Sequence, residues 1–383
     1  MDRPFIPVNT PSLEGNERAY LNECIDSGWI SSEGPFVERF EQEMARRVGR
    51  AQGVAVSSGS AALEVAIEAL ALRPGDEVII PTFTIISCAA PLVRRGVVPV
   101  CVDCDERTFN MDVSQVEAAI GPKTKAIMVV HIYGLPVDLD PVLALARAHE
   151  LRVIEDAAEA HGLCYNGRPC GSFGDLSIFS FYPNKLITTG EGGMVLTDDD
   201  KLAGACRSIR NLCFQPQRRF LHEALGYNFR LSNVQAALGC AQLERLDQAV
   251  EQKRQLGQRY AEGLSAYQEW VQLPLDRTPY AQNVYWIYPL VLREDTGSGT
   301  VNAEQFAALL AQQGVGTRPF FYPIHQQPVF LKRGLFAGVS LPVSERIARQ
   351  GLYIPSGLGL SSDEQEQVIE RVTEVIREVY DAR

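Results

Sequence analysis

Short, almost wholly apolar runs alternate with longer runs of helical periodicity through the first two thirds of the chain. The apolar runs predict strands at 53–56, 76–80, 97–102, 125–130, 151–154, 176–181 and 193–197. Helices are predicted between them at 60–72, 84–95, 113–120 and 139–150. Strands that are apolar throughout are typical of a sheet buried on both faces. The pattern therefore predicts an α/β fold with a mostly parallel sheet covered by helices.

The pattern changes after Asn233. A long helical run at 234–266 is predicted to connect two domains. It is followed by a strand at 285–292, a helix at 303–313 and a terminal amphipathic helix at 362–380. A chain of 383 residues is long for one minimal domain. We expect a large domain over 1–250 and a smaller C-terminal α+β domain over 251–383.

The composition changes the picture mainly by exclusion. A hydrophobic content of 46% and a charged content of 22% are ordinary for a globular protein. The net charge of −11 argues against nucleic acid or an anionic membrane as a partner. The first residues lack the apolar core of a targeting segment, and the apolar runs are of strand length. We expect a cytoplasmic protein.

Nine cysteines are scattered along the chain, and Cys101 and Cys104 form a CxxC pair inside a predicted strand. Positions three apart on a strand point to opposite faces, which does not suit metal binding. An odd count without a targeting segment also argues against a disulfide framework. We expect ordinary thiols and no metal.

Lys185 lies in a glycine- and threonine-rich loop between two predicted strands, and the strand before them leads to Asp156. A lysine can form a Schiff base with the aldehyde of pyridoxal phosphate, while an acid pairs with the pyridine nitrogen. Taken singly, the two residues also fit a solvated loop lysine and a helix N-cap. Together they indicate a pyridoxal phosphate site.

A serine-rich turn at 57–60 closes one predicted strand and opens a helix. Free amides and hydroxyls at a helix N-terminus bind anions, so Ser58, Gly59 and Ser60 are candidate phosphate contacts. An ordinary N-cap serine is the other interpretation. Glu159, three residues after Asp156, would reach the cofactor's ring oxygen if that segment is helical, and a surface position is its alternative.

Two aromatic and polar segments suggest further contacts. The segment 226–233 carries Asn228 and Arg230, which suit phosphate groups, and the segment 319–325 ends in His325. An interdomain turn and a packed loop are the respective alternatives. His131 and His325 lie at strand or loop ends, where functional sites gather.

With these motifs, the chain resembles the DegT/DnrJ/EryC1/StrS family of sugar aminotransferases over nearly its full length. The segments that carry the resemblance are 26–32, 74–81, 124–127, 131–134, 153–160, 180–193 and 226–233. Within the family, three segments are most similar to the branch that forms GDP-perosamine: 11–16, the segment around Trp29, and 241–247. The resemblance implies the fold type I of pyridoxal phosphate-dependent transferases, the aspartate aminotransferase type, working as a homodimer.

The resemblance also assigns roles to single residues. Lys185 matches the Schiff-base lysine, Asp156 the partner of the pyridine nitrogen, and Glu159 a residue near the ring hydroxyl. The matches to phosphate contacts are Gly59, Ser60, Ser180 and, from the other subunit, Asn228.

Three positions depart from the family pattern. Ser58 opens a Ser-Gly-Ser turn where the family often has Asn-Gly-Thr, which keeps the hydrogen-bond donors. Ile85 replaces an aromatic residue that stacks on the cofactor ring, and its apolar face can pack there instead. Tyr182 and Pro183 replace the Phe-Gly of the perosamine branch, which bears on the sugar.

The expected activity is transfer of an amino group from L-glutamate to the keto carbon, at C4, of a nucleotide-linked 4-keto-6-deoxyhexose such as GDP-4-keto-6-deoxymannose. Lys185 would move the proton, with Trp29, Arg230 and His325 on the substrate side. Three alternatives are a C3 aminotransferase acting on a dTDP- or UDP-3-keto sugar, a sugar dehydratase, and a pyridoxal phosphate-binding regulatory protein without turnover. The dehydratase has histidine in place of the lysine, and the intact Lys185–Asp156 pair argues against the regulatory protein.

Overall fold

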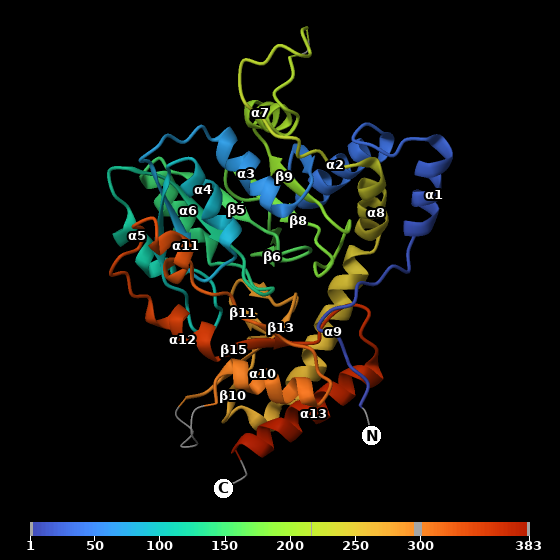
Figure 1. Cartoon of the computed structure of the whole chain (residues 1–383), viewed down its shortest axis with the longest axis vertical. Helices are drawn as coiled ribbons and strands as arrows, with labels where there is room; N and C mark the ends of the chain where they lie inside the picture. The colour runs from blue at the N-terminus through green and yellow to red at the C-terminus, as the bar shows by residue number, and fades with distance from the viewer. Residues whose placement is uncertain (1–2, 216, 295–300, 381–383) are drawn as a thin grey trace.

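A seven-stranded sheet forms the centre of the larger part of the molecule (Figure 1). The computed structural model describes residues 3–215, 217–294 and 301–380. In the sheet order β1-β9-β8-β5-β4-β2-β3, all pairs from β8 to β3 are parallel, and β9 is antiparallel to β1 and β8. The strands are β1 (Gln52–Val56), β2 (Glu77–Pro81), β3 (Val98–Val102), β4 (Thr124–Val130), β5 (Arg152–Asp156), β8 (Leu176–Ser180) and β9 (Gly193–Thr197). The predicted mostly parallel α/β sheet is confirmed.

Helices pack around this sheet, with α3 against β8 and β9, α2 against β1, and α6 against β4 and β5. The central strand β4 is apolar and buried at every position from 126 to 130, as expected for a sheet that is covered on both faces. The elements are α1 (Glu17–Ser27), α2 (Pro35–Val48), α3 (Gly59–Ala69), η1 (Ile86–Cys88), α4 (Ala90–Arg94), η2 (Val113–Gln115), α5 (Val116–Ala119), α6 (Leu139–Ala148), β6 (Cys164–Tyr165), β7 (Arg168–Pro169) and α7 (Asp200–Arg210).

The C-terminal third builds a smaller layer below the large sheet in Figure 1. Its four-stranded sheet has the order β10-β13-β15-β14, with every neighbouring pair antiparallel. The elements are β10 (Val271–Gln272), β11 (Arg277–Thr278), β12 (Ala281–Gln282), β13 (Tyr288–Leu292), α10 (Ala303–Gln312), β14 (Arg318–Pro319), η4 (Ile324–Gln326), α11 (Pro328–Leu331), α12 (Pro342–Gln350), β15 (Gly351–Ile354) and α13 (Ser362–Tyr380). The terminal amphipathic helix has the bounds predicted from its periodicity.

The long helix predicted at 234–266 is two helices, and the single-helix prediction is wrong. α8 (Asn233–Glu244) ends at Arg245, whose φ of −107° lies outside the helical range, and α9 (Leu246–Gly263) begins directly after it. A short 3₁₀ turn, η3 (Ser265–Tyr267), follows. α8 begins with a capping box between Ser232 and Gln235. The break carries no proline or glycine, so the sequence pattern gave no sign of it.

Two other elements are shorter than predicted. The region 84–95 contains η1 and the one-turn α4, because Ile85 is extended, with φ −69° and ψ 145°. The strand predicted at 285–292 begins only at Tyr288, because Tyr285 adopts a left-handed φ of 47°. Both departures place non-regular backbone beside the candidate site described below.

α9 passes between two apolar clusters. Its residues Leu246 and Val250 pack in the cluster of the large sheet, while Leu256 and Tyr260 pack in the cluster of the smaller one.

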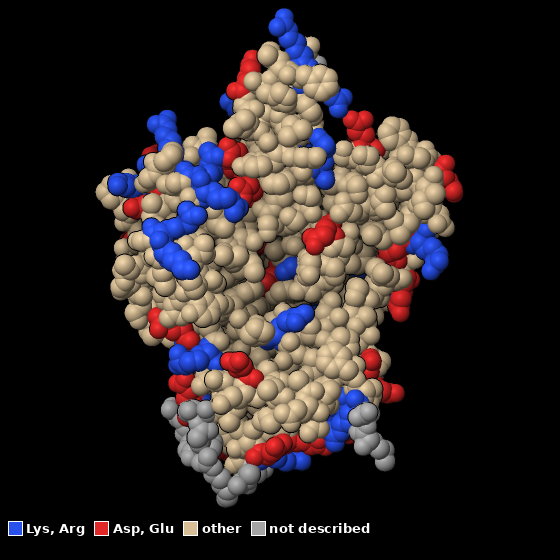
Figure 2. Space-filling view, in the orientation of Figure 1, with Lys and Arg blue, Asp and Glu red and all other residues tan. Residues whose placement is uncertain are grey.

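The visible face of the molecule carries charges of both signs and is hollowed between the upper and lower parts (Figure 2). The division at residue 250 stays a prediction. Within the described ranges, no helix is both long and apolar enough to cross a membrane.

Lys253 of α9 is a lysine buried inside the protein. It is 2% exposed, and its Nζ donates to the backbone carbonyls of Trp286, at 2.8 Å, and of Ser356. Burial lowers the pKa of Lys253 to about 7. In the unfolded chain a lysine has a pKa of roughly 10.4. Between these values the unfolded chain binds more protons, so this residue's contribution to stability rises with pH above 7 and is least favourable below it.

We predict that the free energy of unfolding of the wild type, minus that of Lys253→Met, increases by roughly 2 kcal/mol between pH 6.5 and pH 9. Urea unfolding at a series of pH values measures this difference. The exposed Lys201→Met is the control, for which the difference should stay constant. Parallel stability curves for wild type and Lys253→Met would contradict the prediction.

Candidate active site

The candidate site lies at the carboxyl ends of β5 and β8. Asp156 is the last residue of β5, and the loop that follows β8 carries Lys185. The backbone amide of Lys185 donates to the carbonyl of Tyr182 at 2.9 Å, which closes a turn in that loop. Because the carboxyl ends of parallel strands meet at one edge of a sheet, this edge is where α/β proteins bind ligands.

The structure brings Lys185, Asp156 and Glu159 into one buried cluster. The Nζ of Lys185 lies 3.7 Å from Oε1 of Glu159, and the two acids are 2% and 6% exposed. Burial lowers the pKa of Lys185, against the opposing charges of Glu159 and Asp156. Burial raises the pKa of Asp156, and it raises the pKa of Glu159 to about 7. With one lysine facing two acids, a second cation is needed to keep both acids ionised.

Neutral donors hold the Asp156 carboxylate. Its Oδ1 accepts the amide of Ala158 at 3.0 Å, and its Oδ2 accepts the thiol of Cys88 at 3.4 Å. Cys88 ends η1 and lies 3.3 Å from the Thr84 hydroxyl. Both hydrogen bonds favour the ionised carboxylate and partly offset its burial.

The serine turn forms the N-terminus of α3 against β8. Ser58 is the N-cap, and its hydroxyl accepts the Ala61 amide at 3.1 Å. A Cβ on Gly59 would lie 2.6 Å from the Cβ of Ser180, so only glycine lets the turn come this close to β8. The hydroxyl of Ser60 meets that of Ser87 at 2.7 Å. Helix amides and hydroxyls therefore gather where an anion would bind.

Ile85 and Asn228 are both accessible in the single chain. Ile85 is 46% exposed on the loop before η1. Asn228 is exposed, and its backbone bridges to Asn211. The neighbouring Phe229 carbonyl accepts the Ser57 amide at 2.8 Å, which ties this segment to the serine turn.

Trp29 and Arg230 line a cavity of about 670 Å³ beside α7, separate from the cavity that Lys185 lines. Lys185 lines a different, much smaller cavity with Trp286 and Lys253. The larger cavity is also lined by Arg207, Arg210 and Arg219. Its basic lining stands out in a chain with a net charge of −11.

His325 is inside the protein, 2% exposed. Its Nδ1 meets the hydroxyl of Thr82 at 2.7 Å, and its Nε2 meets the Glu345 carboxylate at 3.0 Å. Both ring nitrogens thus have protein partners: the Thr82 contact fastens η4 to the end of β2, and the Glu345 contact joins it to α12. Its role toward a substrate stays a prediction.

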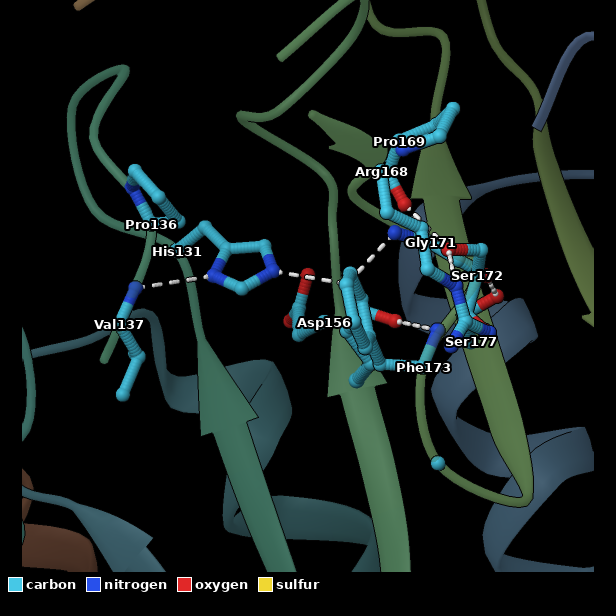
Figure 3. A network of polar contacts seen from close by, with 12 residues as sticks. His131, Pro136, Val137, Asp156, Arg168, Pro169, Gly171, Ser172, Phe173 and Ser177 are labelled. Carbon is cyan, nitrogen blue, oxygen red and sulfur yellow. Dashed lines mark hydrogen bonds and ion pairs between the residues drawn. The ribbon is translucent and has the colours of Figure 1, made fainter. Parts of the chain in front are cut away.

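His131 and Glu155 belong to a buried network of hydrogen bonds at the carboxyl end of β5 (Figure 3). The Nδ1 of His131 accepts the Val137 amide at 3.2 Å, so the ring is neutral and its Nε2–H donates to Glu155 at 2.9 Å. The Glu155 carboxylate also accepts the amides of Gly171, at 2.5 Å, and Phe173, at 2.8 Å. The Cys170 thiol lies close enough to His131 and Glu155 for the three side chains to have the spacing of metal ligands. Because these donors already satisfy the carboxylate, the cluster is a structural support for the 171–173 turn.

Sequence reasoning missed three residues beside Lys185. Cys88 supports Asp156, as described, and the ring of Trp286 lies against the Lys185 ammonium. His161 is fully buried, and neither of its ring nitrogens is within hydrogen-bonding geometry of a partner among the residues that the structure describes. Burial lowers the pKa of His161 to about 3, so it is neutral at physiological pH. Of these three residues, only His161 could have been suspected from the sequence, because it follows Asp156 by five positions.

Comparison with known proteins agrees with this geometry. The profile of the DegT/DnrJ/EryC1/StrS aminotransferase family matches residues 11–373. The chain belongs to this family. It is 41% identical to the GDP-perosamine synthase of Caulobacter vibrioides, over 98% of this chain and 99% of that protein. It is 39% identical to the UDP-N-acetyl-3-dehydro-alpha-D-glucosamine 3-aminotransferase of Acidithiobacillus ferrooxidans, over 88% and 86%. The crystal structure of S. venezuelae DesV in complex with a ketimine intermediate superposes with a TM-score of 0.89, at 33% identity over 97% of this chain and 99% of that one.

This sugar aminotransferase is a pyridoxal phosphate-dependent enzyme of fold type I, as the sequence predicted. The residues present fit that cofactor. A protonated pyridine ring is the second cation that the Asp156 and Glu159 pair needs, and the α3 N-terminus with Gly59 and Ser60 is suited to its phosphate. The separate roles of Lys185, Asp156 and the phosphate contacts are taken up below as proposals.

Removing the thiol donor tests the support of Asp156. Cys88→Ala should raise the pKa of Asp156 further and weaken its attraction for a pyridinium, so the dissociation constant for pyridoxal phosphate should rise about fivefold to tenfold. Cys88→Ser, which keeps a donor, should stay near the wild-type value. Absorbance titration of the apoenzyme with the cofactor gives these constants, with the buried Cys206→Ala of α7 as the matched control. Equal losses in the Ala and Ser variants would count against the hydrogen bond.

Proposed function

We propose that this enzyme transfers the amino group of L-glutamate to the C4 ketone of GDP-4-keto-6-deoxymannose or a closely related GDP-linked 4-keto-6-deoxyhexose. The observation that carries the proposal is the 41% identity to a GDP-perosamine synthase along both whole chains. The buried Lys185–Asp156–Glu159 cluster supports turnover rather than a binding role without chemistry. The cytoplasmic location expected from the sequence stays a prediction.

Lys185 is the proposed acid and base. Pyridoxal phosphate supplies the aldehyde that takes up the amino group and a ring that withdraws electrons from the reacting carbon. Burial lowers the pKa of Lys185, which increases the share of free amine able to accept a proton at Nζ near neutral pH. The Glu159 carboxylate, 3.7 Å from that nitrogen, stabilises the protonated form that results. Lys185 can therefore both take and return the proton.

Asp156 is proposed to hold the pyridine nitrogen in its protonated form. Its carboxylate is fixed by the Ala158 amide and the Cys88 thiol, and it is shielded from water. Gly59, Ser60 and Ser180 are proposed to bind the phosphate, and Ile85 to pack on the ring. Each of these assignments rests on the positions described above and on the family match.

The arginine-lined cavity is proposed to bind the diphosphate of the nucleotide sugar. Arg210 pairs with Glu41, whereas Arg207 and Arg230 bond to neutral side chains and Arg219 lies over the Phe214 ring. Their positive charges are thus available for an anion. The half-exposed ring of Trp29 is suited to the sugar or base.

A homodimer is part of this proposal. The segment that follows α7 projects from the top of the molecule, and in it Phe220 and Leu225 are 84% and 92% exposed (Figure 1). Large apolar side chains exposed on one segment are candidates for contact with a partner surface. A second copy would cover them and would bring the exposed Asn228 toward the other subunit's cofactor phosphate.

Amination at C3 is the second candidate, because a 3-aminotransferase is 39% identical to this chain. Purified enzyme, loaded with amino groups by L-glutamate, should aminate GDP-4-keto-6-deoxymannose and leave UDP-linked 3-keto sugars largely unchanged. Mass spectrometry and NMR of the products identify the aminated carbon. Preference for a 3-keto sugar would reverse the assignment.

The lysine has its own test. Wild-type enzyme should show a visible absorbance band that L-glutamate shifts to the near ultraviolet. Lys185→Ala should bind the cofactor without that band and lose turnover by about a thousandfold or more. Turnover of this variant at the wild-type rate would refute the role of Lys185, and a wild-type band that ignores glutamate would point to another amino donor.

If the arginine-lined cavity binds the nucleotide sugar, a substitution there should change KM for that substrate and leave the rate of the glutamate half-reaction unchanged. Arg219→Ala should raise KM for the nucleotide sugar about tenfold while leaving the glutamate half-reaction unchanged, because the lost contact is to the diphosphate. Stopped-flow absorbance measures the glutamate step, and steady-state rates give KM. Arg349→Ala, in α12 and paired with Glu294, is the control. An unchanged KM for Arg219→Ala would place the diphosphate elsewhere.

A further inference from the structure

Trp286 makes two contacts with the Lys185 loop. The Nζ of Lys185 lies 3.7 Å from the centroid of the indole ring, over its face. The indole N–H donates to the backbone carbonyl of Asn184, the preceding residue, at 2.8 Å. The side chain that holds the ammonium therefore also holds the backbone from which that ammonium extends.

The fold forces Trp286 into this position through strained backbone. Gly134 has a φ of +99°, and a Cβ there would lie 2.7 Å from the Trp286 amide nitrogen. The Gly134 carbonyl accepts the Val284 amide at 3.0 Å, which holds this approach. Tyr285 takes a left-handed φ of 47°, and its amide donates to the Asn283 side chain at 2.6 Å. Such conformations persist where surrounding contacts over-determine them.

Lys253 holds the backbone of Trp286 from the side of the smaller sheet. Its buried Nζ donates to the Trp286 carbonyl at 2.8 Å and to the Ser356 carbonyl after β15. The chemistry proposed above gives this buried lysine no task. By joining α9 and the end of β15 to Trp286, it secures the indole from the side of the smaller sheet.

We propose that Trp286 is the positioning residue for Lys185, holding the free ammonium on its indole face while the lysine is detached from the cofactor. The inference rests on the proposed role of Lys185. A cation over an indole face is stabilised by the ring's electron density, most strongly where water is excluded. Trp286 thus acts beside Glu159 and Asp156, the acids that attract the same cation, while His161 nearby is neutral.

The test uses apoenzyme and pyridoxal phosphate. The rate at which the visible band forms depends on the free-amine fraction of Lys185, so its pH profile reports the pKa of that lysine. Trp286→Leu should shift the profile toward acid by about one pH unit, since the charged form loses the ring face. Trp286→Phe, which keeps a ring but loses the N–H, should shift it less.

Trp270→Phe is the matched control, because Trp270 stacks on Tyr380 in the smaller layer. Its profile should coincide with that of the wild type. A Trp286→Leu profile that superposes on the wild type, or a Phe shift as large as the Leu shift, overturns the proposal. If the Leu variant does not fold, the Trp286→Phe profile decides the question: a shift toward acid supports the proposal, and no shift overturns it. If wild-type protein forms no visible band, the failure is that of the lysine's cofactor role and not of Trp286.

Discussion

The candidate active site depends on two buried carboxylates that face a single lysine. Asp156 and Glu159 are buried together, and Lys185 is the cation that faces them. Charge attraction is strong in such a low-dielectric setting, and an uncompensated carboxylate there reverts to its neutral form. The protein alone therefore leaves the cluster short of one cation. With the cofactor placed as proposed above, its positive ring would supply that charge, and cofactor binding and ionisation of the acids would favour each other.

β5 shows two ways to keep a carboxylate inside a protein. Glu155 is surrounded by donors from His131 and the amides of Gly171 and Phe173, and this satisfied group fastens a turn. Asp156 has fewer protein donors, the Ala158 amide and the Cys88 thiol, and so keeps capacity for a ligand. The two neighbouring acids of β5 therefore differ in how fully the protein satisfies them.

The sheet and the gathering of Lys185, Asp156 and Glu159 could be predicted because each signal is local. An apolar strand, a strand-end acid and a glycine-rich loop are each visible within a few consecutive residues. The supports could not be predicted in this way. Trp286 meets the Lys185 loop across 102 positions of sequence, and Cys88 reaches Asp156 across 68. The break at Arg245 and the left-handed Tyr285 also depend on distant packing rather than on local propensity.

The adjacent acids of β5 also bear on how the sheet assembles. Val129 and Val130 of β4 pair with Glu155 and Asp156, and successive residues of a strand face opposite sides. A slip of one position would carry each acid to the wrong side, placing both charges against surfaces that lack their donors. Misaligned pairings of β5 would thus bury bare charge, whereas the native alignment satisfies it. The two adjacent acids therefore make the native register of β4 and β5 energetically distinct from a register that is shifted by one residue.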